Sequence, residues 1–145
     1  MKLVRTVNSP RPAAEVYVYL VDFTTTEEWE PATESTTLVA AAPGGGDGVG
    51  AKYRNRTRFL GRTTELTYVV EEADPPKRIR LRGENKTVIA KDTMTLVPTT
   101  SGGTRVTYQA EFEFRGLARF VAPLLAPALK RLGDNAQRGM EQALA

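Results

Sequence analysis

The sequence contains no cysteine and no histidine. The absence of cysteine excludes disulfide bonds, thiol nucleophiles and thiolate metal ligands. The absence of histidine removes the usual general base near neutral pH and the commonest zinc ligand. Any acid–base chemistry must therefore use aspartate, glutamate, tyrosine or lysine with a shifted pKa. The sequence also lacks a loop of spaced carboxylates for calcium, so we expect no metal and no other cofactor.

Long hydrophobic runs are missing as well. No stretch approaches the ~20 predominantly apolar residues that a membrane-spanning helix requires, and the N-terminus lacks the apolar core of a signal peptide. The 145 residues are 41% hydrophobic and 26% charged, which is typical of one globular domain over residues 1–145. We expect a cytoplasmic monomer or homodimer without a membrane span.

The net charge is only +3, although the arginines are conspicuously placed. They recur at every second position in two segments: Arg54, Arg56, Arg58, Arg80 and Arg82. A period of two places them on one face of a β-sheet, where Glu65 and Glu71 share their parity. No aromatic residues interleave with them, so we interpret this face as solvated and charge-paired, and we expect no nucleic-acid partner.

Alternating polar and apolar residues predict seven strands joined by Gly, Pro and Asn turns. The expected strands are Lys2–Asn8, Thr37–Ala42, Lys52–Phe59, Thr63–Glu72, Arg78–Gly83, Thr87–Val97 and Arg105–Phe114. A hairpin at Leu60-Gly61 would set Tyr53 opposite Tyr68 and Arg56 opposite Glu65. The pattern indicates an antiparallel sheet with one solvent-exposed face and one apolar face.

Helical spacing appears in three places. A helix is expected to begin at Pro12, and a short helical piece to cover Thr24–Trp29 before Pro31. Apolar residues keep a helical period over the last thirty residues, but Pro123 and Pro127 should kink or break its first part. The long regular portion is therefore predicted at Ala128–Ala143. The sheet must curl around this helix, which gives an α+β fold.

This order of elements resembles the START-like superfamily (the helix-grip or SRPBCC fold), specifically its bacterial polyketide cyclase/dehydrase-like and lipid-transport-like group. The matching landmarks are Ser9-Pro-Arg-Pro-Ala-Ala-Glu-Val16, Asp22 followed by Trp29-Glu-Pro31, Val49-Gly50, Glu72-Ala-Asp-Pro-Pro76 and Gly103-Thr-Arg-Val-Thr107. The resemblance implies a deep cavity between the curled sheet and the long helix. It further implies an opening near the two short helices and the glycine loop at residues 43–50. Members bind lipids, sterols or polyketides, and some cyclise or dehydrate them.

Strand register nominates the residues that would face this cavity. They are the polar Tyr53, Asn55, Thr57, Tyr68 and Tyr108 and the apolar Leu81, Met94 and Phe112. Trp29 would either line the cavity mouth or pack the short helix against the sheet. Each tyrosine could instead be an ordinary core residue with one hydrogen-bond partner. Asp92 is the only inward carboxylate in its strand, so burial would make it a candidate general acid or base. Alternatively, a bulge near Lys91-Asp92 would turn it toward solvent, or neighbouring Arg or Tyr side chains would satisfy it.

Three functions fit these features. The first is binding of a hydrophobic small molecule, such as a lipid or polyketide, in the cavity. The second is a metal-free polyketide cyclase or dehydratase using Asp92 with a tyrosine. The third is an interaction module whose cavity is filled by side chains. The glycine loop lacks the helix N-terminus and Lys-Ser/Thr pair of a phosphate loop, so we interpret it as a flexible lip over the cavity mouth.

Overall fold

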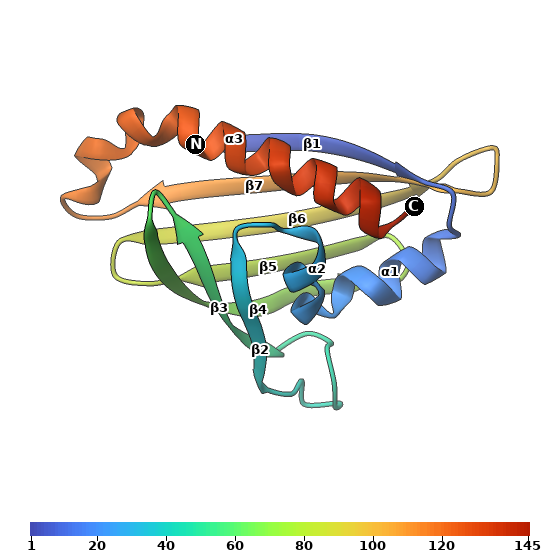
Figure 1. The fold of residues 1–145 in the computed structure, drawn as a ribbon. Coiled ribbons are helices and arrows are strands. Elements are labelled where there is room, and N and C mark those ends of the chain that lie inside the picture. The colour runs from blue at the N-terminus through green and yellow to red at the C-terminus, as the bar shows by residue number, and fades with distance from the viewer.

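The computed structural model describes residues 1–145 as one antiparallel sheet that wraps a long helix (Figure 1). The strands are β1 (Lys2–Ser9), β2 (Thr33–Ala40), β3 (Lys52–Phe59), β4 (Arg62–Asp74), β5 (Arg78–Glu84), β6 (Val88–Pro98) and β7 (Thr104–Phe114). The helices are α1 (Ala13–Val21), the 3-10 turn η1 (Phe23–Thr25), α2 (Thr26–Trp29) and α3 (Ala118–Ala143). These elements confirm the predicted helix-grip fold.

The strand order is β1-β7-β6-β5-β4-β3-β2, so the first two strands lie at opposite edges of the sheet. The chain between them must cross from one edge to the other. It does so through α1, η1 and α2, which cover one end of the concave face while α3 lies over the rest (Figure 1). This crossover leaves the space between α3 and the sheet to be filled by side chains or by a ligand.

The predicted register of the β3–β4 hairpin is confirmed, with Tyr53 opposite Tyr68 and Arg56 opposite Glu65. The prediction for β2 was wrong at its start, because this strand begins four residues earlier, at Thr33. Two register shifts within the β2–β3 pairing interrupt the alternation on which the prediction depended.

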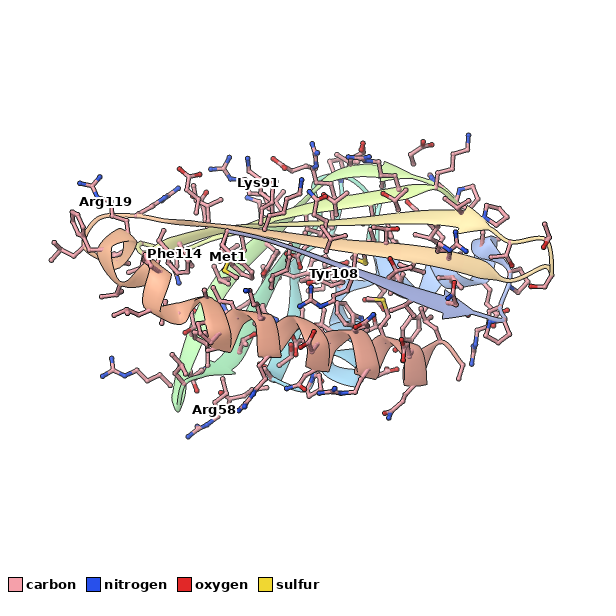
Figure 2. The ribbon with its side chains drawn as sticks, turned by 90° about the horizontal axis from the view of Figure 1, so that it is seen from above. Met1, Arg58, Lys91, Tyr108, Phe114 and Arg119 are labelled. Atoms are coloured by element: carbon pink, nitrogen blue, oxygen red, sulfur yellow. The ribbon has the colours of Figure 1, made fainter.

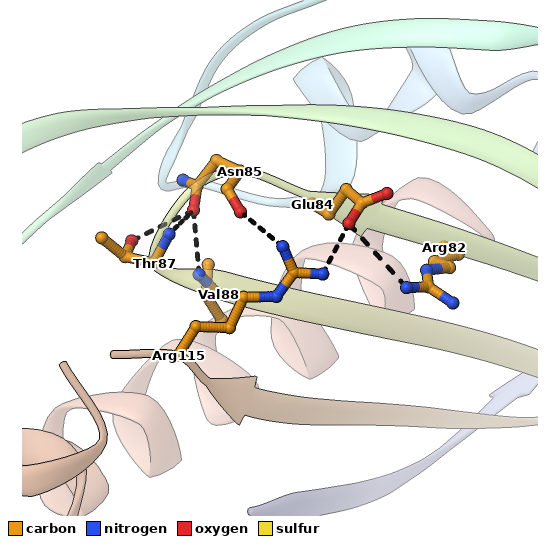
Figure 3. Close-up of polar contacts among 6 residues, drawn as sticks. All are labelled: Arg82, Glu84, Asn85, Thr87, Val88 and Arg115. Atoms are coloured by element: carbon orange, nitrogen blue, oxygen red, sulfur yellow. Dashed lines mark hydrogen bonds and ion pairs between the residues drawn. The ribbon is translucent and has the colours of Figure 1, made fainter. Parts of the chain in front are cut away.

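The outer face of the sheet carries charge pairs, but among the arginines and glutamates named from the sequence only Arg54 and Glu65 pair, at 3.8 Å. Arg78 lies 2.9 Å from Glu72, and Arg115 lies 2.7 Å from Glu84 at the end of β5. Figure 3 shows how the second contact closes the β5–β6 turn, where Arg115 also donates to the Asn85 carbonyl. All these groups are partly exposed, so each pair contributes at most about 1 kcal/mol.

Helix α3 runs without interruption from Ala118 to Ala143, although Pro123 and Pro127 lie inside it. The expected break is absent, but its first turns follow a different direction from the remainder, as expected of a proline bend (Figure 1). Its buried residues, Leu129, Ala136 and Met140, all lie beyond the prolines. The helix is therefore packed along its C-terminal two-thirds and exposed at its start.

The core divides into a main cluster of 23 buried residues and a small one of Leu3, Ala110 and Leu129. The main cluster contains Trp29, Leu81, Met94, Leu96, Val106 and Met140. Phe112 and Leu132 are only half-buried. Phe112 packs against both clusters, so it lies where the two parts of the core meet.

None of the helices combines the length and apolar composition that crossing a membrane requires.

Candidate functional site

A cavity of about 490 Å³ lies between the concave face of the sheet and α3. Its volume is within the range of small-molecule sites, roughly 300–1,000 Å³. Figure 2 shows two of its wall residues, Tyr108 and Phe114, between the sheet and the helix, with Lys91 on the opposite face. Most of the wall is hydrophobic. The cavity is thus open space in an apolar surrounding, not a core filled by its own side chains.

Seven of the ten predicted site residues line this cavity. They are Trp29, Asn55, Thr57, Tyr68, Asp92, Tyr108 and Phe112. The other three, Tyr53, Leu81 and Met94, are fully buried in the main core and do not form part of the wall. The expectation failed for Tyr53 because Phe23 from η1 packs edge-on against its ring, at 5.9 Å between ring centres.

Leu81 and Met94 were placed correctly on the inward face of the sheet. One part of that face lines the cavity, and the other part belongs to the closed core. Leu81 pairs with Asp92 and Met94 pairs with Tyr108 in the strand ladders, so each neighbours a wall residue. Both belong to the main cluster with the buried residues of α1 and η1. Alternation identifies the inward side of a strand, but it does not show which helix covers each position.

Asp92 and Tyr108 form the polar centre of the cavity. The Tyr108 hydroxyl donates a hydrogen bond of 2.9 Å to Oδ2 of Asp92, whose side chain faces inward and is only 5% exposed. Burial raises the pKa of Asp92 to about 6, although the hydrogen bond from Tyr108 opposes this rise. The alternative that a bulge turns Asp92 toward solvent is therefore wrong.

Glu30 is a second wall carboxylate, which the sequence analysis did not identify. It follows α2 directly, and its Oε1 accepts a hydrogen bond of 3.0 Å from the Ala32 amide. Burial raises its pKa to about 7, and the nearby Asp92 carboxylate contributes to the rise. Glu30 lies in an irregular segment without periodicity, so its orientation could not be predicted. Its place in the Trp29-Glu-Pro31 landmark was the only available signal.

Tyr68 provides a free hydroxyl in the cavity. Burial, followed by the charges of Asp92 and Glu30, raises its pKa well above the ordinary value, so the hydroxyl stays protonated. Its ring packs against Phe23, with 4.8 Å between ring centres, and against the backbone of Gly83, where a β-carbon would lie 2.6 Å from the ring. Neighbours thus fix the ring, while the hydroxyl makes no hydrogen bond to another side chain and remains available for a ligand.

Asn55 and Thr57 are already engaged within the protein. Asn55 donates to the Thr36 hydroxyl at 2.8 Å and accepts from the Thr57 hydroxyl at 2.7 Å. Thr36 in turn lies 2.6 Å from the Thr26 hydroxyl, which belongs to α2. This chain of hydrogen bonds ties α2 to β2 and β3. Asn55 therefore holds the cavity wall in place. Tyr68, Asp92 and Glu30 remain as the groups that can form hydrogen bonds with a ligand.

The glycine loop does not form the cavity mouth. None of residues 43–50 lines the cavity, and the loop lies below β2, away from α3 (Figure 1). The interpretation of this loop as a lip, and the expected opening beside it, were therefore wrong. The end of the cavity away from α1 is lined by Leu60 and Arg62 of the β3–β4 hairpin and by Ala118 and Leu125 of α3.

No group of three or more Asp, Glu, His or Cys side chains is arranged to hold a metal ion. The arrangement offers the buried Asp92 carboxyl, the half-buried Glu30 carboxyl and two protonated tyrosine hydroxyls in an apolar space. Such a site can donate and accept hydrogen bonds, and it can transfer protons near neutral pH.

This architecture, a curled sheet that grips a C-terminal helix over a cavity, is that of START-like proteins. Comparison with solved structures agrees. A START superfamily protein from Mycobacterium smegmatis has a TM-score of 0.81 at 13% identity, with 99% of this chain and 96% of that chain covered. A protein from Thermus thermophilus also scores 0.81, at 18% identity and 99% and 97% coverage. The Zhui aromatase/cyclase from a Streptomyces species scores 0.81 at 15% identity, with 99% and 93% covered.

Residues 1–145 match the family described as polyketide cyclase / dehydrase and lipid transport, and the chain belongs to this family. The resemblance inferred from the sequence landmarks is confirmed. No curated protein matches the sequence.

Proposed function

We propose that the protein binds a small, mostly apolar molecule that carries hydroxyl or carbonyl oxygens. The observation that carries the proposal is the unpaired Tyr68 hydroxyl within an apolar cavity of about 490 Å³, beside the Asp92–Tyr108 pair. The Tyr68 hydroxyl makes no hydrogen bond to another side chain and lies in a mostly hydrophobic wall. A ligand oxygen that accepts from it would therefore form a stabilising hydrogen bond. The family description, which includes lipid transport, supports a ligand of this kind.

The carboxyl groups restrict the ligand further. Asp92 and Glu30 line the cavity, whereas its only basic residue, Arg62, is exposed. An anionic group beside the two carboxylates would be repelled in a low-dielectric space. The proposed ligand is therefore neutral in the part that lies near Asp92, and its hydroxyl groups can donate to that carboxylate.

Catalysis is the second candidate, and the two carboxyl groups with pKa values of about 6 and about 7 favour it. Near neutral pH such groups can both take up and release protons. The family description includes polyketide cyclases and dehydrases, and the similar Streptomyces protein is an aromatase/cyclase. In this role Asp92, oriented by Tyr108, would take the proton from a carbon next to a ketone as that carbon bonds to a second ketone carbon. Glu30 would give a proton to the second ketone oxygen, which becomes a hydroxyl, and loss of this hydroxyl with a neighbouring hydrogen would release water. Release of water from a poly-β-ketone thioester, followed by mass spectrometry, would identify the reaction.

Binding is tested with a matched pair of tricyclic probes, 1,8-dihydroxyanthraquinone and anthraquinone, by calorimetric titration. We expect Tyr68→Phe to weaken binding of either probe by about fivefold or more, since a hydrogen bond worth about 1 kcal/mol is lost. Tyr19→Phe is the control, because the Tyr19 hydroxyl bonds to Glu28 at 2.8 Å and lines no part of the cavity. Equal affinities for wild type and Tyr68→Phe would contradict the assignment.

A further inference from the structure

The start of α3 presents large apolar side chains to solvent. Leu117 is 84% exposed, Phe120 67% and Leu124 79%. At the neighbouring hairpin tip between β3 and β4, Leu60 is 64% exposed. A single exposed leucine is ordinary, but several large apolar side chains within eight residues of one helix indicate an interaction surface.

These residues surround one end of the cavity. Leu60 itself lines the cavity, as do Ala118 and Leu125, which lie among the exposed residues of α3. Figure 1 places the start of α3 and the β3–β4 hairpin tip at the same end of the molecule, away from α1. The exposed apolar side chains therefore lie where a ligand would enter.

The chain segment that contains the start of α3 carries positive charge only. Residues 115–133 contain Arg115, Arg119, Lys130 and Arg131 and no acidic side chain. Arg115 is neutralised by Glu84, but the Arg119 guanidinium lies over the Phe120 ring, 4.8 Å from its centre.

The basic character extends to the hairpin. A surface groove between this hairpin and α3 is lined by Arg58 and Arg131 together with Leu60. Positive charge therefore flanks the exposed apolar side chains on both elements.

We propose that Leu60, Leu117, Phe120 and Leu124, with Arg58, Arg119 and Arg131, form a docking surface for an anionic lipid bilayer. Apolar side chains at this spacing can enter the boundary between head groups and acyl chains, while the arginines contact lipid phosphates. A second copy of the chain would bring like charges together, which disfavours self-association through this surface.

Docking does not depend on what the cavity holds. Its consequence for transport rests on the proposed function: an apolar ligand could pass between bilayer and cavity without crossing water. Phe120 and Leu124 do not line the cavity, so their replacement separates docking from ligand binding.

The test is co-sedimentation of the full chain with vesicles of phosphatidylcholine containing phosphatidylglycerol, compared with phosphatidylcholine alone. We expect binding to the anionic vesicles, at least roughly tenfold weaker for Phe120→Ser/Leu124→Ser. Arg119→Gln/Arg131→Gln should also weaken binding about tenfold at low salt. Val18→Ser/Val97→Ser is the control, because both valines are exposed on other elements; it should bind as wild type does.

Three results would overturn the docking surface. They are no sedimentation of wild type with anionic vesicles, unchanged binding of Phe120→Ser/Leu124→Ser, and a wild-type dimer in light scattering that this variant converts to a monomer. Binding of 1,8-dihydroxyanthraquinone, measured without vesicles, should be the same in wild type and Phe120→Ser/Leu124→Ser. Failure of the docking surface and failure of the cavity site can therefore be told apart.

Discussion

At the scale of single residues, the cavity combines groups that were predictable with one that was not. Asp92 and Tyr108 could be placed because strict alternation in β6 and β7 fixes their side of the sheet. The contact between them follows from the ladder, in which Asp92 pairs with Ala110 and Tyr108 with Met94 on adjacent strands. Glu30 could not be placed, because the direction of a side chain after a short helix depends on the tertiary fold.

Asp92 should make stability depend on pH. Burial raises its pKa from 3.8 to about 6, so the folded state holds this proton more tightly than the unfolded chain does. The stabilisation is complete below about pH 4 and is lost as pH rises through about 6. This difference between the pKa of Asp92 in the unfolded and the folded protein corresponds to about 3 kcal/mol in the free energy of unfolding.

Asp92→Asn cannot titrate at this position. The unfolding free energy of Asp92→Asn relative to wild type should therefore rise by up to about 3 kcal/mol between about pH 4 and pH 7. Urea titrations across this range measure the difference, with Asp47→Asn in the glycine loop as the control. Parallel curves for wild type and Asp92→Asn would show that the carboxyl group is not desolvated.

At the scale of elements, the strands were easier to predict than the residues at which they end and the helices that cover them. β3 and β7 follow a regular alternation and were predicted to within one residue at each end. The bulges in β2 and the path of the glycine loop were not predictable, because both depend on how the sheet curls. α3 was predicted too short, since the prolines bend the helix without ending it.

The contact between α3 and α2 depends on Gly139. A β-carbon there would lie 2.0 Å from the Trp29 carbonyl oxygen, which is backbone and cannot move independently. Gly139→Ala should therefore destabilise the protein by about 1–3 kcal/mol, although alanine favours a helix by about 1 kcal/mol over glycine. Displacement of Trp29 should also weaken binding of 1,8-dihydroxyanthraquinone.

Gly133→Ala is the matched control in the same helix. There the nearest atom to a β-carbon is the flexible Leu3 side-chain methyl, at 3.2 Å. We expect its stability to stay within about 1 kcal/mol of wild type. Equal thermal midpoints for the two variants in scanning calorimetry would refute the close approach at Gly139.

At the scale of the whole molecule, the fold leaves a space that its own side chains do not fill. The sheet curls far enough to grip α3, but the buried side of the helix begins only at Leu129. The unfilled region extends toward the start of α3, where Ala118 and Leu125 line it. The sequence indicated a cavity through its family resemblance, whereas the position of the opening required the three-dimensional path of the chain.

The most direct test of ligand binding in this cavity is to fill it. Thr64 lines the cavity from β4, whereas Thr67 on the same strand is exposed. Calorimetric titration with 1,8-dihydroxyanthraquinone should show binding of about one molar equivalent to wild type and to Thr67→Trp, and at least roughly tenfold weaker binding to Thr64→Trp, provided that its thermal midpoint shows it to be folded. Undiminished binding to a folded Thr64→Trp, or no binding to wild type, would contradict the proposal that the cavity is the ligand site.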